Sequence, residues 1–407
     1  MTKRNKLKIL NDPIYGFVSM PNEFIFDLIE HQYFQRLRRI TQMGMSHLVY
    51  PGAHHTRFHH AIGCMHLMKT TIDVLRRKRV PISQKEEEAL LIAILLHDIG
   101  HGPFSHAMEH SIVNEVSHEE ISLLFMKRLN EEFKGKLSMA IEIFQGNYSR
   151  KFMHQLISSQ LDMDRMDYLK RDSFYTGVYE GNINSERLIS MLNVQNDQLV
   201  IEQKGIYSVE KLLISRRLMY WQVYLHKTSI VAENILTNIL RRAKYLTQQG
   251  EEVSSGKALM YFIKNYVTKE EFSNEILDIF SKLDDYDIMS SVKEWSNHHD
   301  FVLRKLCNML LNRHLLKIEI SKMPFNTNYV LTQKHVAMLT YGISIEEADY
   351  FVFTGMISNQ AYNKEYQNIN VLDKGRNTRD ISEASDHYNL EALSMKVTKH
   401  FMCSLKL

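Results

Sequence analysis

Residues 95–106, LLHDIGHGPFSH, decide the fold class of this chain and contain its clearest functional signal. They end a run of aliphatic residues and alanines over 89–96, so a helix there must be buried on nearly every face. His97 and Asp98 place an imidazole and a carboxylate at the tip of this helix, and two glycines within the next four residues let the chain turn away. Because burying both polar groups without partners would cost several kcal/mol, the pattern predicts that they bind a metal ion.

Helical patterns extend from this stretch in both directions. Ser83, followed three residues later by Glu86, is typical of a capping box at the start of the apolar helix. Apolar residues recur at helical spacing over 23–43, broken at most once, and over 56–77, 118–133, 136–145, 150–171, 184–192 and 207–248. A hairpin-like or extended entry segment at 1–20 and a β-like run at 198–203 interrupt the pattern. We therefore expect a mainly α-helical body.

The pattern changes toward the C-terminal end of the chain. After a loop at 250–256, helical spacing resumes to about residue 316. Beyond it, three segments have alternating or β-branched character: 318–321, 328–332 and 369–373. The segment 373–378 is rich in turn-forming residues. We predict four parts: an N-terminal segment and helix packed on the core (1–55), the core (56–248), a helical extension (249–317) and a small α+β appendage (318–407).

Composition excludes several classes of protein. Hydrophobic residues make up 44% and charged residues 24% of the 407, which is typical of a folded, soluble chain rather than a disordered one. The formal net charge of +3 is too small to indicate nucleic-acid or membrane binding, although nucleic acid remains open. Three isolated cysteines, no signal-peptide pattern and no apolar run of about 18 residues favour a reducing cytoplasm.

Histidine is the unusual residue, because eleven of the 20 lie between residues 47 and 118. Arg57 and His60 stand three apart, which places an imidazole ligand and a guanidinium suited to phosphate on one helical face. Within 161–168, LDMDRMDY, carboxylates stand among apolar residues on another predicted helix. Imidazoles and carboxylates together suit one divalent cation, with manganese, iron, zinc and magnesium not distinguished.

The chain closely resembles the HD-domain deoxynucleoside triphosphate (dNTP) triphosphohydrolases in three motifs that occur in the same order: RFHH at 57–60, HDIGHGPFSH at 97–106 and DRMDY at 164–168. This family includes the vertebrate sterile-alpha-motif and HD-domain dNTPase and its bacterial relatives. The resemblance covers about residues 8–317 and begins at NDPIYG (11–16) and FQRLRRITQ (34–42). It implies an HD-domain helical bundle without a sterile-alpha-motif domain, followed by an appendage like that of bacterial HD phosphohydrolases.

The resemblance assigns four metal ligands: His60, His97, Asp98 and Asp164. Spacing supports the choice of Asp164, since Tyr168 and Asp172 follow it at intervals of four on one helical face. Asp162 and Asp167 point elsewhere and are expected to be surface or helix-pairing carboxylates.

The resemblance also implies hydrolysis of a dNTP to a deoxynucleoside and triphosphate. A triphosphate needs cations along its length, and three arginines stand at matching positions: Arg57, Arg165 and Arg216. Arg165 replaces a lysine, which keeps the charge but changes the donor geometry. For proton transfer the matching residues are His106 and His118, with Glu109 near the first in place of an aspartate, and His101 as a further contact.

Within 207–248, three residues spaced four and four form one cationic and aromatic stripe: Arg216, Tyr220 and Tyr224. By default such a stripe is core packing. The resemblance instead places Tyr224 against C2′ of the deoxyribose, where its ring would exclude a hydroxyl, and Tyr168 alongside the sugar. Gln42 and Asp172 match the residues that bind the 3′-hydroxyl.

Regulation and assembly are also implied by the resemblance. The vertebrate relatives bind an activating guanine nucleotide through an early helix, where Gln35 and Arg38 match and Glu30 replaces an aspartate. The longer side chain moves the carboxylate by about a bond length, so a nucleotide activator can differ or be absent. Because such sites lie between subunits, we expect a homodimer or homotetramer.

Two other functions stay open from the sequence. One is an HD phosphohydrolase or phosphodiesterase acting on another nucleotide, such as a monophosphate, a cyclic dinucleotide or an alarmone. The other is a nucleotide sensor or nucleic-acid-binding protein with a residual metal site. The three arginines favour a triphosphate over the first, and the near-neutral charge argues against the second. Four further histidines are expected at the surface or around the site: His54, His55, His59 and His110.

Overall fold

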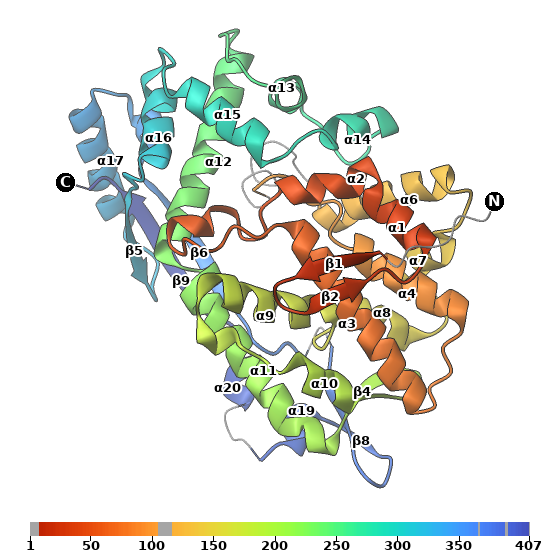
Figure 1. Ribbon diagram of the computed structural model, residues 1–407. Helices are drawn as coiled ribbons and strands as arrows, with labels where there is room; N and C mark the ends of the chain where they lie inside the picture. Colours follow the sequence, from red (N-terminus) through yellow and green to blue (C-terminus); the bar gives the residue numbers. More distant parts are fainter. Residues whose placement is uncertain (1–7, 105–115, 365–366, 387–389, 407) are drawn as a thin grey trace.

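Helix α4 (Gln84–Leu96) is a buried helix of the computed structural model, which describes residues 8–104, 116–364, 367–386 and 390–406 (Figure 1). The predicted capping box of Ser83 and Glu86 begins it. All residues from 89 to 96 are buried, and the helix packs against α3 (Arg57–Arg77) and α7 (Ser138–Phe144). The prediction of a mainly helical protein around this apolar run is confirmed.

Two glycines let neighbouring helices approach the end of α4. Where α3 packs on α9 (Met163–Thr176), a Cβ on Gly63 would lie 2.0 Å from an Asp167 carboxylate oxygen. In the turn after α4, a Cβ on Gly100 would lie 2.2 Å from the carbonyl oxygen of His118 and from the backbone nitrogen of Ser122, both in α6 (His118–Glu132). Only glycine fits at such close approaches without displacing backbone or buried polar groups.

The N-terminal segment forms the predicted hairpin from β1 (Ile9–Asp12) and β2 (Gly16–Ser19). The helix predicted over 23–43 becomes α1 (Glu23–Glu30), α2 (Gln32–Gln35) and the 3-10 turn η1 (Arg36–Arg39). It breaks at His31, whose ring nitrogen Nδ1 accepts a hydrogen bond from the backbone N–H of Tyr33 at 3.2 Å and so caps α2. The helical structure ends at Arg39 rather than at residue 43, and a second 3-10 turn, η2, covers Gly44–Leu48.

Two long predicted helices are each interrupted in the structure. The first, predicted over 150–171, is divided into α8 (Lys151–Ile157) and α9, and α9 continues to Thr176. The division arises because Asp162 begins a new helix by accepting a hydrogen bond from the backbone N–H of Arg165 at 2.7 Å. The second, 207–248, contains α11 (Ile206–Met219), the π-helical turn η5 (Tyr220–Tyr224) and α12 (Lys227–Gln248). The predicted stripe is nevertheless kept through the π turn, because the Arg216 guanidinium lies 5.7 Å from the centroid of the Tyr220 ring, and the Tyr220 and Tyr224 centroids are 5.1 Å apart.

Further helices complete the core and its extension. α10 (Ser185–Met191) leads into the antiparallel pair β3 (Leu192–Gln195) and β4 (Gln198–Glu202), which confirms the predicted β-like run. After the loop at 250–256, α13 to α16 lie together at the top of Figure 1, and α16 packs on α12. Their bounds are Lys257–Lys264, Asn274–Phe280, Asp285–Trp295 and Phe301–Leu311.

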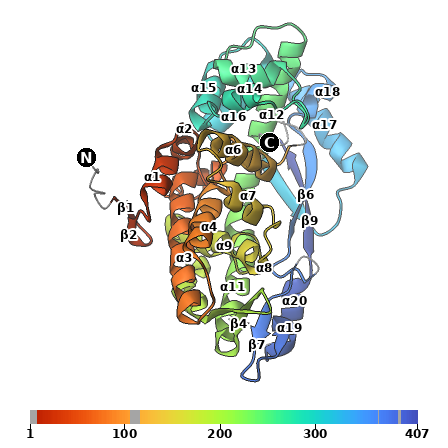
Figure 2. The same cartoon turned by 90° about the vertical axis from the view of Figure 1, so that its right-hand side faces the viewer.

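The appendage contains a three-stranded antiparallel sheet in the order β5 (Lys317–Ser321), β9 (Val397–Ser404), β6 (Phe353–Asn359), which lies along one side of the helical core (Figure 2). The strand predicted at 328–332 is wrong, because these residues belong to α17 (Thr327–Tyr341). Asn326 caps this helix by accepting a hydrogen bond from the backbone N–H of Asn328 at 2.8 Å.

The appendage also extends the sheet of the core. Its hairpin of β7 (Asn370–Leu372) and β8 (Thr378–Asp380) confirms the predicted turn at 373–378, and β7 pairs in parallel with β4. Three short helices complete it: α18 (Ile345–Ala348), α19 (Ile381–Ala384) and α20 (Leu390–Ser394). Appendage and core are therefore joined by backbone hydrogen bonds. Among the described residues, no helix has the length and apolar character needed to cross a bilayer.

Candidate active site

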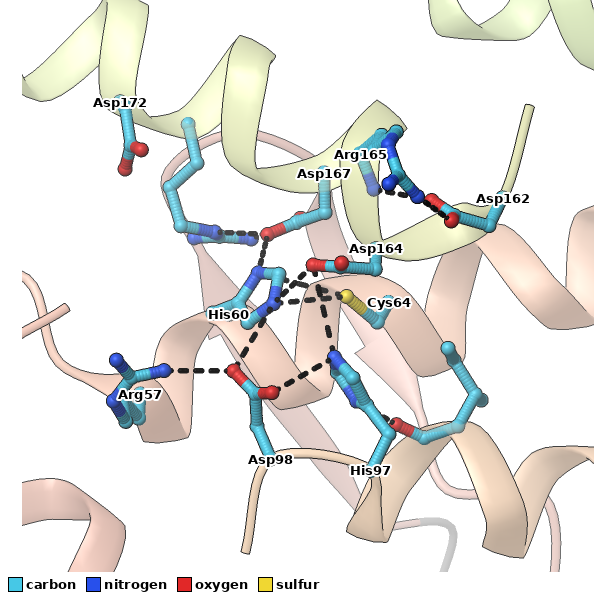
Figure 3. A network of polar contacts seen from close by, with 12 residues as sticks. Arg57, His60, Cys64, His97, Asp98, Asp162, Asp164, Arg165, Asp167 and Asp172 are labelled. Carbon is cyan, nitrogen blue, oxygen red and sulfur yellow. Dashed lines mark hydrogen bonds and ion pairs between the residues drawn. The ribbon is translucent and has the colours of Figure 1, made fainter. Parts of the chain in front are cut away.

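His60 lies fully buried on α3 with its two ring nitrogens facing different carboxylates. Its Nδ1–H donates to Asp167 Oδ2 at 2.7 Å, and its Nε2 lies 3.1 Å from Asp164 Oδ1 (Figure 3). Burial opposes ionisation of Asp167, but the Arg171 guanidinium and the His60 hydrogen bond outweigh it and lower its pKa to about 2. An ionised Asp167 holds the proton on Nδ1, which leaves the Nε2 lone pair for a metal ion.

His97 and Asp98 lie where α4 ends, as predicted. The Nδ1–H of His97 donates to the carbonyl oxygen of Ile94 at 2.7 Å, and its Nε2 is buried without a hydrogen-bond partner. That Nε2 lies 3.4 Å from Asp98 Oδ1 and 3.7 Å from Asp164 Oδ1. The other Asp98 oxygen accepts a hydrogen bond from Arg57 Nη1 at 2.7 Å and lies 3.8 Å from His60 Nε2.

The structure thus brings the four predicted ligands together from three separate segments. Two imidazole nitrogens with their other nitrogen already bonded, and two carboxylates, form a donor set that fits one divalent cation. A cation would also satisfy the buried Nε2 of His97. Although burial opposes ionisation of Asp164, the adjacent His60 and His97 imidazoles more than offset this and lower its pKa, so the carboxylate is ionised.

Asp162 and Asp167 are not surface carboxylates, since both side chains are fully buried. Asp162 caps α9 and pairs with Arg165, which agrees with the helix-pairing alternative. Asp167 orients a proposed ligand and pairs with Arg171, whose Nη1 donates to Asp12 at 2.8 Å. Asp167 reaches His60 because α3 packs against α9, and this packing cannot be predicted from the helical periodicity of α9 alone.

Cys64 is a neighbour of the site that sequence reasoning missed. Its sulfur lies 3.5 Å from Nδ1 and 3.6 Å from Nε2 of His60, and it could join His60, His97 and Asp164 around a metal ion. Its position one helical turn after His60 was the available signal. Burial raises the pKa of this thiol, which favours the protonated form over the thiolate that binds metal.

A second group of side chains adjoins the first through Asp98. The Nε2 of His101 lies 3.4 Å from Asp98 Oδ1, and the rings of His101 and His118 stack with centroids 3.8 Å apart. Burial and the nearby Arg57 guanidinium lower the pKa of His101, so its ring is neutral near pH 7. The predicted catalytic residues His106 and Glu109 lie outside the described residues.

The predicted sugar-binding residues also come together. Asp172 accepts hydrogen bonds from the Tyr224 hydroxyl at 2.7 Å and from His55 Nε2 at 2.6 Å. The Tyr224 ring lies 6.0 Å from that of Tyr168 and 5.1 Å from that of Tyr220, between centroids. His55 is buried and stacks on Tyr175, so it supports Asp172 rather than facing solvent. Predicted as a 3′-hydroxyl ligand, Gln42 has a buried Oε1 without a hydrogen-bond partner.

The three predicted phosphate-binding arginines have different surroundings. Arg57 is buried beside Asp98, as described above. Arg165 donates to Asp162 and to the carbonyl oxygen of Ser159, so part of its charge is already compensated. Arg216 donates through Nη1 to the carbonyl oxygen of Ala361 at 3.2 Å.

The residues of the predicted effector site lie on and after α1. Arg38 Nε donates to Gln35 Oε1 at 2.9 Å, and its guanidinium lies 3.6 Å from the centroid of the Phe58 ring. Glu30 is exposed at the end of α1. The structure therefore brings Gln35 and Arg38 into contact, and the effector site stays a prediction.

Known proteins are similar to this chain in both fold and sequence. Residues 57–172 match the HD domain, and residues 183–256 match the HD associated region. The uncharacterized protein YwfO of Bacillus subtilis is 36% identical over 77% of this chain and 72% of its own length. The crystal structure of a phosphohydrolase from Bacteroides thetaiotaomicron is similar with a TM-score of 0.95 and 48% identity, covering 98% of this chain and 100% of that one.

These similarities and the buried histidine and aspartate cluster show that the chain belongs to the HD-domain phosphohydrolases, which are metal-dependent enzymes. A more distant relative carries a more specific name. The deoxynucleoside triphosphate triphosphohydrolase SAMHD1 homolog of Dictyostelium discoideum is 30% identical over 67% of this chain and 57% of its own length.

Proposed function

We propose that this chain hydrolyses a dNTP to its deoxynucleoside and triphosphate in a metal-dependent reaction. The observation that carries the proposal is the order of side chains along α9. Asp164, Tyr168 and Asp172 stand on successive turns of one face, over a length of about 12 Å, with Arg165 at the edge of that face. Asp164 and Arg165 would lie at the phosphates, and Tyr168 and Asp172 would lie at the sugar. The order of these side chains along the helix therefore matches the order of phosphate and sugar in a nucleotide.

The fixed position of Tyr224 supports a deoxyribose as the sugar. Its hydroxyl donates to Asp172, and its ring lies edge-on to that of Tyr168. Burial, with the Asp172 carboxylate close by, raises the pKa of Tyr224, so the hydroxyl keeps its proton and remains a donor. A ring held in this way would clash with a 2′-hydroxyl, and such a clash disfavours a ribonucleotide by a few kcal/mol.

The residues around the proposed ligands have distinct tasks in this reaction. When bound, a divalent cation would supply polarisation of a phosphate oxygen and activation of water. Arg57 orients Asp98 and brings a guanidinium to the same place, where it would bind phosphate. His118 stacks on the neutral His101 and its side chain is 30% exposed, so it can exchange protons with solvent and donate one to the leaving 5′-oxygen.

Product analysis tests the proposal directly. The purified chain is incubated with each dNTP, singly and as mixtures, with manganese or magnesium, and triphosphate is separated from pyrophosphate and phosphate. We expect triphosphate and deoxynucleoside in equal amounts, and loss of activity in His97→Ala and Asp98→Ala. Release of no triphosphate from any dNTP or mixture would overturn the proposal, and activity in either variant would overturn the site assignment.

We further propose that the chain assembles into a homodimer or homotetramer and that a nucleotide regulates it through Gln35 and Arg38. The contact between these side chains supports the regulatory part of the proposal, because the pair presents an amide and a guanidinium together to a nucleotide. Light scattering with and without each nucleotide tests the assembly. An unchanged monomer in every condition would contradict it.

A further inference from the structure

A polar pocket lies between the helical core and the appendage. It includes Arg165, which directly follows the proposed metal ligand Asp164. Its volume is about 340 Å³. Three cations and three side-chain amides line it: Arg165, Arg216, Lys396, Gln160, Gln360 and Asn363. Among the described residues no carboxylate lines this pocket, so its chemistry fits an anion.

Half of these side chains come from the appendage, and hydrogen bonds hold them in place. Gln160 of the core donates through Nε2 to the carbonyl oxygen of Asn363 at 2.8 Å, and its Oε1 accepts from the backbone N–H of Asn363 at 3.1 Å. Gln360 donates to the carbonyl oxygen of Ser394 at 2.8 Å, two residues before Lys396. The neighbouring helix α20 packs on α11 (Figure 2). Both appendage segments are therefore fixed at the pocket.

The positive charge of the pocket is only partly compensated. Asp162 pairs with Arg165, whereas Arg216 and the exposed Lys396 have no carboxylate partner in the part of the chain that the structure describes. The Nε atoms of Arg165 and Arg216 are buried without hydrogen-bond partners. Buried donors and uncompensated cations are stabilised when an anion binds them.

The pocket lies at the phosphate end of the proposed substrate site. Figure 3 shows Arg165 close to Asp164 and Asp172 far to the left, and along α9 Arg165 directly follows Asp164 whereas Asp172 comes eight residues after it. A nucleotide with its sugar at Asp172 and its first phosphate at the metal ligands therefore extends its later phosphates toward Arg165.

The family resemblance already implies that Arg165 and Arg216 bind phosphate; we propose that Lys396 of the appendage contacts the terminal phosphate of the substrate in the same pocket. This inference rests on the proposed function, because it assigns a place to one end of the triphosphate. The appendage then makes the site selective for a triphosphate, since a diphosphate would be too short to reach Lys396.

Binding of inorganic polyphosphates to the full-length chain tests the inference without any turnover. Lys396→Gln removes the ammonium group, and Lys374→Gln removes the same charge from the exposed turn between β7 and β8. By calorimetry with manganese present, we expect Lys396→Gln to weaken binding of tripolyphosphate roughly tenfold, as for loss of a hydrogen bond to a charged group. Pyrophosphate binding should change less than about twofold, Lys374→Gln should match the wild type, and Lys396→Arg should restore most of the affinity.

The outcomes separate this inference from the proposed function. If Lys396→Gln weakens tripolyphosphate binding while the wild type hydrolyses no dNTP, the pocket stands and the substrate is wrong. If dNTPs are hydrolysed but Lys396→Gln binds tripolyphosphate like Lys374→Gln, the role of Lys396 is overturned. Equal weakening of tripolyphosphate and pyrophosphate would overturn the selection by chain length.

Discussion

Asp167 decides how His60 is presented to a metal ion, although it bonds the ring nitrogen Nδ1 and not the Nε2 that faces Asp164. One of its oxygens accepts the His60 Nδ1–H at 2.7 Å, and both accept hydrogen bonds from Arg171 at 2.9 Å. A carboxylate behind a histidine ligand sets the tautomer and strengthens the ligand. The affinity for metal therefore depends on a residue that would not touch the metal.

Asp167→Asn tests this dependence. We expect the variant to bind manganese about 10- to 100-fold more weakly by calorimetry, because an amide no longer favours the proton on Nδ1 of His60. Asp73→Asn is a matched control, since Asp73 lies on the same helix as His60 and pairs with Lys69 at the surface. Wild-type affinity in Asp167→Asn would show that the tautomer is set by another group.

At the scale of elements, α6 holds the turn that carries His97 and Asp98. The buried Ser122 donates through Oγ to the carbonyl oxygen of His97 at 2.8 Å and accepts from the backbone N–H of Gly100 at 2.9 Å. These bonds satisfy backbone groups at the end of α4 that have no partner within the helix. The position of the metal ligands is therefore coupled to the packing of α6.

Ser122→Ala should destabilise the protein by about 1–3 kcal/mol, because two buried backbone groups lose their partner. It should also weaken manganese binding, since the turn becomes free to move. Urea unfolding and calorimetry measure the two effects. Ser291→Ala removes a buried serine that bonds only within its own helix α15, and should leave metal affinity unchanged. Equal metal affinity in both variants would contradict the coupling.

At the scale of the whole molecule, a partly buried glutamate on α12, Glu233, links stability to pH. Burial alone raises the pKa of Glu233 from 4.5 to about 7. The neutral form is favoured in the folded state, so this contribution to stability is complete below pH 4.5 and is lost as the pH rises through 7.

We expect the free energy of unfolding of the wild type to fall by about 2–3 kcal/mol between pH 5 and pH 8, relative to Glu233→Gln. Urea unfolding at both pH values measures the difference. Glu294→Gln changes an exposed glutamate of α15 and should follow the wild type. A Glu233→Gln variant with the same pH dependence as the wild type would show that the carboxylate is solvated.

Local patterns predicted most of the helices but not their interruptions. The apolar run of α4 and its capping box depend on residues a few positions apart, so both can be recognised in the sequence. The π turn η5 separates α11 from α12 although apolar spacing continues through it. In α17 a β-like composition was overridden by the cap at Asn326 and by packing on α18 and β9.

The sequence by itself determined the HD-domain class and the four proposed metal ligands, because their motifs are short and each occupies one element. Only the tertiary structure decided what surrounds them. Asp167, Ser122 and His55 act across pairs of helices or loops, and their contacts have no signature in local spacing. Lys396 reaches the pocket beside Arg165 only because the appendage pairs β7 with β4 and packs on α11. Such contacts depend on how distant segments fold together, which the order of residues along one helix cannot specify.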